Sequence, residues 1–470
     1  MSLPNLIEIV PLDKPVRAEI TVPGSKSITN RALILAAWAE GTVTLRGALW
    51  SEDTQIMVEC LQQLGFDVRV ADDPAEFCNR TITVHGLGGN IPKAGTEAQP
   101  LELFVGNAGT AARFLSAFLC LGRGVYRLHG VPRMHERPQA ALFQALRELG
   151  YRVESEASND KLPVRIYGEG PKPGACGVSV EESSQFASAL LLCMCKGGWE
   201  VGIMDSNPEE LPYVEMTSKM INAFPQNGGN FQIEPDASSG SYFWAAGWLL
   251  AERIEDRMEK FRKTRQTMAD NPDHTSTASL HKLFQNEFSH IRVKNWPDSH
   301  WQPDDDFKIF VSGPLEIPTS VSRLHDLADS IMTVITLAPL NGGAVECVKF
   351  TDLGRLRVQE CERVVALRTE LTKCGAKVVE EGDTLTVWPS TLHGAEIETY
   401  NDHRMAMCFA ILGLKIPGIK IKNPACVKKT FPNFFQKLAA APPHGLGAEI
   451  WEIKDGQRTR KLEGADLFAE

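Results

Sequence analysis

The sequence predicts an α/β protein, because one arrangement of residues recurs six times along its 470 residues. In each copy, Ser, Asn or Asp, in several copies together with Gly or Ala, precedes an apolar helical stretch, and the fuller copies continue with a Gly, a β-branched strand and a second amphipathic helix. Ser, Asn and Asp cap helix N-termini, and Gly ends helices. Alternation of helices and strands is typical of α/β architecture. The 43% hydrophobic and 23% charged content excludes intrinsic disorder and low-complexity filaments.

The first three copies occupy the N-terminal half of the chain. The first starts at 24–27 and predicts helix 30–40, strand 42–45, helix 53–64 and strand 67–70. The second starts at 107–110 and predicts helix 111–121, strand 125–129 and helix 138–149. The third starts at 183–185 and predicts helix 186–196 and strand 200–204.

The last three copies follow residue 234, and less regular stretches interrupt them. They start at 236–239, near Asp329 and at 401–404, and they predict helices 330–340, 358–373 and 433–440 and strands 345–350 and 419–422. Residues 251–319 form an irregular excursion, and its part 252–264 is highly charged, which favours a solvated helix or arm. Residues 441–470 are expected to form an appended tail with a strand at 449–453.

The formal net charge of −10 gives no support for chain-wide binding to nucleic acid or acidic membranes. An anion site must therefore be a local cluster of cations. The 11 cysteines are dispersed without a CxxC pair, which argues for a reducing compartment and against a zinc site. The N-terminus lacks a signal-peptide pattern, and the longest apolar run is far shorter than a membrane span. We therefore expect a soluble cytoplasmic protein.

Five short segments combine cations with small or polar residues near expected helix starts. They are GSKSITNR from Gly24, NAGTAAR from Asn107, PRMHERP from Pro132, YNDHR from Tyr400 and KKTFP from Lys428. Helix N-termini and backbone N–H groups bind anions, and Lys and Arg add charge. Taken singly, each segment has an ordinary structural interpretation as a turn, a cap, a surface salt bridge or a solvated lysine pair. The first is not a Walker loop, because the GxxxxGK[ST] spacing is absent.

Taken together and in order, these segments resemble the 5-enolpyruvylshikimate-3-phosphate synthase family of enolpyruvyl transferases. The motifs SSQ at Ser183 and DASS at Asp236 belong to the same series, which covers most of residues 7–438. The resemblance implies a two-domain inside-out α/β barrel fold, with three repeats in each domain and the active site in the cleft between them. It places residues 1–22 and 235–440 in one domain and residues 23–234 in the other.

The resemblance also implies a reaction and its residues. Such enzymes transfer the enolpyruvyl group of phosphoenolpyruvate to the 5-hydroxyl of shikimate 3-phosphate and release phosphate. The implied catalytic residues are Lys26, Asp329 as the base, Glu360 and His403. The implied substrate-binding residues are Lys26, Ser27, Arg31, Asn107, Gly109, Thr110, Arg133, Ser183, Ser184, Gln185, Tyr213, Asp329, Gln359, Arg363, Arg404 and Lys429. No metal or organic cofactor, nucleic acid or membrane partner is implied, and the family favours a monomer.

Three positions depart from the family pattern. Gln359 stands where the family has a lysine, Glu210 stands where it has a serine, and Phe114 replaces a proline, which leaves glyphosate sensitivity open. Arg355 is a candidate to compensate for the lost lysine. Beside an active synthase, two alternatives remain: a diverged enolpyruvyl transferase with another acceptor, and a non-catalytic homologue that binds anions.

Overall fold

The computed structural model describes residues 3–204, 211–251, 290–297, 299–311, 317–341 and 345–469. The chain forms two compact units. Unit 1 comprises Met1–Val22, Ala237–Trp296 and Asp304–Glu470, and unit 2 comprises Pro23–Asp236 and Pro297–Pro303. The expected charged arm at 252–264 and the departure at Glu210 lie outside the described residues.

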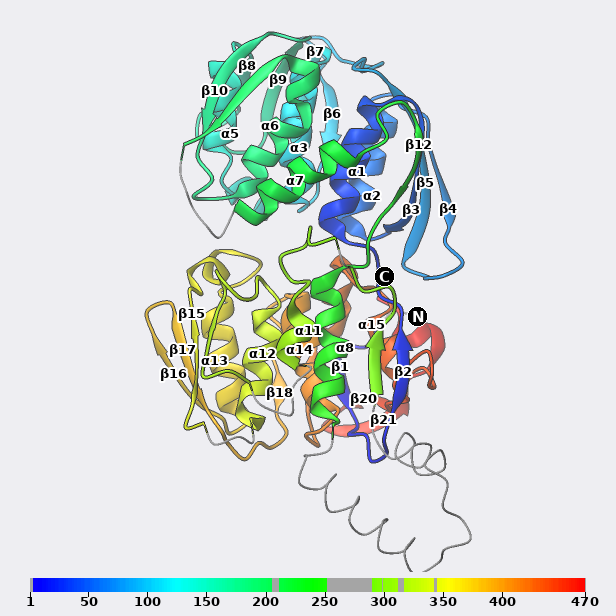
Figure 1. Ribbon diagram of the computed structural model, residues 1–470, viewed down its shortest axis with the longest axis vertical. Coiled ribbons are helices and arrows are strands. Elements are labelled where there is room, and N and C mark those ends of the chain that lie inside the picture. Colours follow the sequence, from blue (N-terminus) through cyan, green and yellow to red (C-terminus); the bar gives the residue numbers. More distant parts are fainter. Residues whose placement is uncertain are drawn as a thin grey trace, which may run out of the picture. The chain divides into compact units, whose positions relative to one another are not determined.

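Unit 2 contains three buried helices that pack against one another: α1 (Lys26–Trp38), α3 (Gly109–Cys120) and α6 (Ser184–Gly197) (Figure 1). Each of them also packs against strands of a different sheet. The other helices in the described part of this unit are α2 (Glu52–Gln63), α4 (Pro132–Glu136), α5 (Ala140–Glu148) and α7 (Leu211–Ala223). Nearly all residues of α1 and α3 are buried, as is typical of helices enclosed by other elements.

The sheets of unit 2 mix parallel and antiparallel pairs. The first sheet has the order β12 (Gly229–Gln232), β3 (Glu40–Leu49), β5 (Asn79–Leu87), β4 (Val68–Asp72). The second has the order β6 (Leu101–Phe104), β7 (Arg123–His129), β9 (Val164–Glu169), β8 (Arg152–Ser155). In both, the first two strands are parallel and the others antiparallel. The third sheet pairs β10 (Gly174–Val178) with β11 (Trp199–Ile203) in parallel.

Unit 1 repeats this plan around α8 (Ala237–Leu249), α12 (Ile331–Leu337) and α14 (His403–Gly413), which pack together. Among the described residues, its other helices are α11 (Phe307–Val311), α13 (Arg363–Lys373) and α15 (Phe434–Ala439), with 3-10 turns η2 (Ala338–Leu340), η3 (Gly354–Val358), η4 (Pro424–Lys429) and η5 (Gly464–Leu467). One sheet has the order β14 (Ser320–Ser322), β15 (Val348–Thr351), β17 (Thr384–Trp388), β16 (Lys377–Glu381), and another pairs β2 (Arg17–Ile20) with β13 (His290–Val293).

The C-terminal segment is more than an appended tail. The third sheet of unit 1 has the order β18 (Glu396–Ile397), β19 (Lys420–Lys422), β1 (Leu6–Ile9), β20 (Ile450–Lys454), β21 (Gln457–Lys461). β1 lies between β19 and β20 and is antiparallel to both. The predicted strand therefore forms, and it completes a sheet instead of ending the chain outside the fold.

Two further expectations need correction. The excursion 251–319 contributes β13 to a sheet, and its Trp301 stacks on Phe231 of unit 2 at a centroid distance of 6.2 Å. The helix expected over 358–373 starts only at Arg363, because the Glu362 side chain caps α13 by accepting from the backbone N–H of Val365. Residues 359–362 therefore lie outside the helix, and the side chains of Gln359 and Glu360 contact Arg363. Among the described residues, no helix is long and apolar enough to cross a membrane.

Candidate active site

In unit 2 the start of α6 collects several of the sequence-predicted residues. Ser183 is the N-cap, and its hydroxyl accepts from the backbone N–H of Gln185 at 3.3 Å. The buried Arg113 donates through Nη1 to Ser183 Oγ at 3.2 Å and to Gln185 Oε1 at 2.8 Å. Ser184 is also buried. The sequence did not lead to an assignment of Arg113 to the site, although Arg113 is the last residue of NAGTAAR, one of the five candidate anion-binding segments.

Arg31 is a buried cation on α1 that is held by uncharged oxygens. Its Nε donates to Thr217 Oγ1 at 2.8 Å, and Nη2 donates to Ser188 Oγ at 3.0 Å. The carbonyls of Ser27 and Tyr213 accept from its other N–H groups. Burial lowers the pKa of Arg31 to about 10, an effect that the Tyr213 side chain partly opposes. Within the described part of the chain, no carboxylate forms an ion pair with Arg31.

The aromatic ring of Phe114 lies 5.3 Å from the Arg31 guanidinium carbon. Phe114 lies within α3 and is fully buried. This residue, which departs from the family pattern, therefore contacts Arg31, a predicted substrate-binding residue. A cation over an aromatic face gains electrostatic stabilisation, which helps to keep this arginine charged.

Lys26 lies in the first turn of α1 and has an acidic partner. Its Nζ is 3.1 Å from Oδ2 of Asp53, a residue of α2 that sequence reasoning missed. The lysine side chain retains 22% exposure, against 6% for the aspartate. This ion pair fixes Lys26, whose side chain stays partly accessible.

The turn before α3 depends on a glycine. Arg137 Nη1 donates to the carbonyl of Asn107 at 3.1 Å, and a Cβ at position 109 would lie 2.7 Å from Arg137 Nη2. Gly109 therefore permits the arginine to pass close to the chain. Thr110 is buried in the first turn of α3. Arg133 differs from these residues, because its side chain is 58% exposed and pairs with Glu136 at 2.5 Å.

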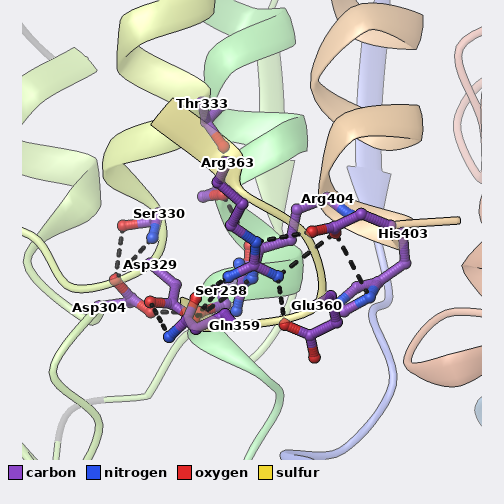
Figure 2. Close-up of polar contacts among 12 residues, drawn as sticks. Ser238, Asp304, Asp329, Ser330, Thr333, Gln359, Glu360, Arg363, His403 and Arg404 are labelled. Carbon is purple, nitrogen blue, oxygen red and sulfur yellow. Dashed lines mark hydrogen bonds and ion pairs between the residues drawn. The ribbon is translucent and has the colours of Figure 1, made fainter. Parts of the chain in front are cut away.

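In unit 1 the buried Arg363 connects three carboxylates (Figure 2). Its Nε donates to Asp402 Oδ2 at 2.7 Å, Nη2 donates to Glu360 Oε2 at 2.8 Å, and Nη1 lies 3.4 Å from Asp329 Oδ2. Burial by itself would lower the pKa of Arg363, but the three carboxylates outweigh it and raise that pKa. The arginine is thus fixed in the charged state.

Asp329 is surrounded by arginines. Arg323 Nη2 donates to its Oδ1 at 3.1 Å, and Arg404 Nε lies 3.6 Å from its Oδ2. Gln359 bridges the group, since its amide donates to Asp329 Oδ1 at 3.3 Å and its carbonyl accepts from Arg363. Burial would raise the pKa of Asp329, but Arg404, Arg323 and Arg363 together lower it below the usual range. Asp329 is therefore an ionised carboxylate and, in this state, a weak base.

Glu360 and Lys429 form an ion pair next to Arg363. Lys429 Nζ lies 2.9 Å from Glu360 Oε1, and both side chains are partly accessible, at 17% and 23% exposure respectively. Lys429 comes from η4 and Glu360 from the loop before α13. Arg357, close by in sequence, instead pairs with Glu362, Glu380 and Asp383.

Asp402 caps α14 and is the second acid that sequence reasoning did not assign. Its Oδ1 accepts from the backbone N–H of Arg404 at 2.8 Å, and its side chain is fully buried. The sequence signal that could have identified Asp402 is its place at an expected helix cap, two residues before Arg404. Burial would raise its pKa, but Arg363 outweighs it and lowers the pKa. Burial lowers the pKa of His403 to about 3, so this imidazole is neutral at pH 7.

Asp304, from the segment 251–319 that was expected to be an excursion, contacts the residue next to Asp329. Asp304 Oδ1 accepts from the backbone N–H of Ser330 at 3.1 Å and from its hydroxyl at 2.6 Å, and Oδ2 accepts from Ser238. Burial raises the pKa of Asp304. These bonds fix Ser330, the residue that follows Asp329.

The family model described as EPSP synthase (3-phosphoshikimate 1-carboxyvinyltransferase) matches residues 11–438. The chain belongs to the EPSP synthase family. A 3-phosphoshikimate 1-carboxyvinyltransferase of Nostoc punctiforme is 34% identical over 453 residues, covering 92% of this chain and 98% of the relative. The solved EPSP synthase of Acinetobacter baumannii has a TM-score of 0.67 and 23% identity, covering 95% of this chain and all of the other. The enolpyruvyl transferase NikO of Streptomyces tendae has a TM-score of 0.59 and 14% identity, with 96% and 99% covered. At these identities the two structures establish the mixed α/β fold alone.

Proposed function

We propose that this protein is a 3-phosphoshikimate 1-carboxyvinyltransferase, which transfers the enolpyruvyl group of phosphoenolpyruvate to the 5-hydroxyl of shikimate 3-phosphate. The observation that carries the proposal is the ion-pair cluster of Arg363, Asp329, Glu360 and Lys429, all residues that the resemblance implies, in a chain that belongs to the EPSP synthase family. It offers cations for anionic substrates next to carboxylates for proton transfer.

The proposal assigns substrate binding to both units. Shikimate 3-phosphate contacts Ser27, Arg31, Ser183, Ser184, Gln185 and Tyr213, with Lys26 close to the reacting atoms. Phosphoenolpyruvate contacts Asn107, Gly109, Thr110, Arg133, Arg363, Arg404 and Lys429. Arg31 supports this assignment, because a buried cation without a carboxylate partner among the described residues gains much from an anionic ligand.

The proposal assigns the proton transfers to the carboxylates. Glu360, working with Lys26, delivers a proton to the vinyl carbon of phosphoenolpyruvate, and the double bond supplies the electron pair. The 5-hydroxyl oxygen attacks the resulting cationic carbon while its proton passes to Asp329. Loss of phosphate from the tetrahedral intermediate and of a proton from the methyl carbon regenerates the enol ether.

Asp329 needs substrate before it acts as a base. Its low pKa comes from Arg404, Arg323 and Arg363. When the carboxylate and phosphate of the substrates bind Arg404 and Arg363, they neutralise part of this positive field, and the pKa of Asp329 rises. Asp329 therefore accepts the proton of the 5-hydroxyl only when both substrates are bound. His403 is neutral and enters the proposal as a hydrogen-bonding group only.

The test is release of phosphate from phosphoenolpyruvate by the purified protein, with and without shikimate 3-phosphate. We expect turnover that requires both compounds. Saturable binding of both without turnover would overturn the proposal in favour of an anion-binding homologue. Turnover only with a different hydroxyl acceptor would favour the diverged transferase, for which Gln359 is the structural argument. The inside-out barrel, the cleft between the domains, the monomeric state and the cytoplasmic location stay predictions.

A further inference from the structure

Arg323 is held in place by an ordered turn of the chain. It follows β14, and its backbone N–H donates to the carbonyl of Thr351 at 3.1 Å, which extends the pairing of β14 with β15. The carbonyl of Ser322 accepts from the backbone N–H groups of Asp326 and Leu327, and the N–H of Ser322 donates to Asp326 Oδ2 at 2.7 Å. The backbone from which the Arg323 side chain extends is therefore fixed.

The two oxygens of Asp329 have different surroundings. Oδ1 accepts from Arg323 at 3.1 Å and from the uncharged amide of Gln359 at 3.3 Å. Oδ2 faces Arg363 at 3.4 Å and Arg404 at 3.6 Å. Arg363 and Arg404 are assigned to phosphoenolpyruvate through the family resemblance, whereas Arg323 is assigned to neither substrate. With 4% exposure, its side chain is too buried for a surface role.

We infer that Arg323 is a positioning residue for the proposed transfer. It orients the Asp329 carboxylate through Oδ1 and keeps it ionised, and thereby supplies the positive charge that the neutral Gln359 does not bring to this oxygen. The inference rests on the proposed function and adds a residue to it. Because Arg323 is not assigned to substrate, its charge stays next to Asp329 when Arg363 and Arg404 engage phosphoenolpyruvate.

The first test compares Arg323→Gln and Arg323→Lys with the wild type in steady-state phosphate release. Hydrogen bonds to charged groups contribute enough that we expect Arg323→Gln to lower kcat by about 10- to 100-fold, with the KM of both substrates changed less. Arg323→Lys should recover a large part of kcat. The matched control is Arg368→Gln, which removes a partly exposed arginine paired with Glu380 at 2.9 Å and should leave kcat unchanged.

The second test asks whether a charge at position 359 replaces the one at 323. Introducing Gln359→Lys into the Arg323→Gln variant should raise kcat at least several-fold, because the new ammonium group extends from the position that already reaches Asp329 Oδ1. Introduced into the wild type, Gln359→Lys should give a smaller gain or none. Melting temperatures of all variants separate loss of fold from loss of catalysis.

The third test uses the pH profile of kcat/KM. Besides Arg323, the charged groups that face Asp329 are Arg404, Arg363, Glu360 and Asp304. Removing one cation raises the pKa of Asp329, so the acid-side loss of activity should move to higher pH in Arg323→Gln and stay in place in Arg323→Lys. An active wild type with Arg323→Gln folded and within twofold of its kcat would overturn the inference alone. A folded wild type without turnover would overturn the proposed function, and the inference with it.

Discussion

The two units hold buried arginine in opposite ways. In unit 2, Arg31 donates to hydroxyls and carbonyls, and burial depresses its pKa. In unit 1, Arg363 is equally buried, but it pairs with Asp402, Glu360 and Asp329, and its pKa rises. Among the described residues Arg31 has no carboxylate partner, which suits it to an anionic ligand, whereas Arg363 keeps its neighbouring acids ionised. The difference teaches that the same residue type is held by neutral hydrogen-bond acceptors in one unit and by carboxylates in the other.

The largest effects are expected when Arg31 or Arg363 is replaced by an uncharged residue. Arg363→Met leaves the buried Asp402 carboxylate without its arginine partner and removes one cation each from Glu360 and Asp329, so it should cost about 3–5 kcal/mol in free energy of unfolding and abolish turnover. Arg31→Met leaves uncharged oxygens and should cost about 1–3 kcal/mol. Chemical denaturation measures both. Equal costs would contradict the distinction between the two units.

Asp329→Asn separates chemistry from binding in unit 1. The amide cannot accept the hydroxyl proton, so we expect kcat to fall by about 10²- to 10⁴-fold. The KM for shikimate 3-phosphate should change much less. Steady-state kinetics with both substrates checks this, and a kcat close to that of the wild type would assign the base role elsewhere.

Arg31→Met should weaken binding more than it slows chemistry. Loss of a charged hydrogen bond to the carboxylate of shikimate 3-phosphate should raise its Kd by about 10- to 100-fold. Isothermal titration calorimetry measures the affinity, and phosphoenolpyruvate serves as the control ligand. An unchanged Kd would place Arg31 among purely structural residues.

The carboxylates of unit 1 predict a pH dependence of stability. The folded-state pKa of Asp402 is lowered, so its stabilisation is complete above the unfolded pKa of about 3.9 and disappears as pH falls toward the folded value. The free energy of unfolding should therefore decline below about pH 4. Asp402→Asn should flatten this decline. If the wild type and Asp402→Asn showed parallel pH curves, the pKa of Asp402 would not be lowered.

The smallest effect on stability is expected at Arg133. Its pair with Glu136 is exposed, with 58% and 62% of the side chains accessible. Arg133→Gln should change the free energy of unfolding by less than about 1 kcal/mol. If Arg133 binds phosphoenolpyruvate as proposed, the Kd of that ligand should rise even though the melting temperature is unchanged. A large loss of stability would show that the arginine has a structural role.

The sequence predicts what is local and misses what depends on tertiary contacts. Ser183 and Asp402 stand directly before apolar helices, and both are caps in the structure. Arg323 and Asp304 carry no such signal, because Arg323 contacts Asp329, and Asp304 contacts Ser330, only after the chain has folded back. The late start of α13 was hidden as well, since residues 359–362 are compatible with a helix, and the ion pair of Glu360 with the distant Lys429 forms only in the folded chain.

The position of β1 between β19 and β20 sets an order of events during synthesis. Unit 2 is nearly contiguous in sequence, so most of it can fold while the ribosome is still translating unit 1. β1 has to wait, since its partner residues lie at 420–422 and 450–452. At about 5–20 residues per second, the delay after residue 236 is roughly 10–50 s. During that interval the N-terminal strand has none of its sheet partners, so its apolar residues Leu6, Ile7 and Ile9 cannot yet be covered by this sheet.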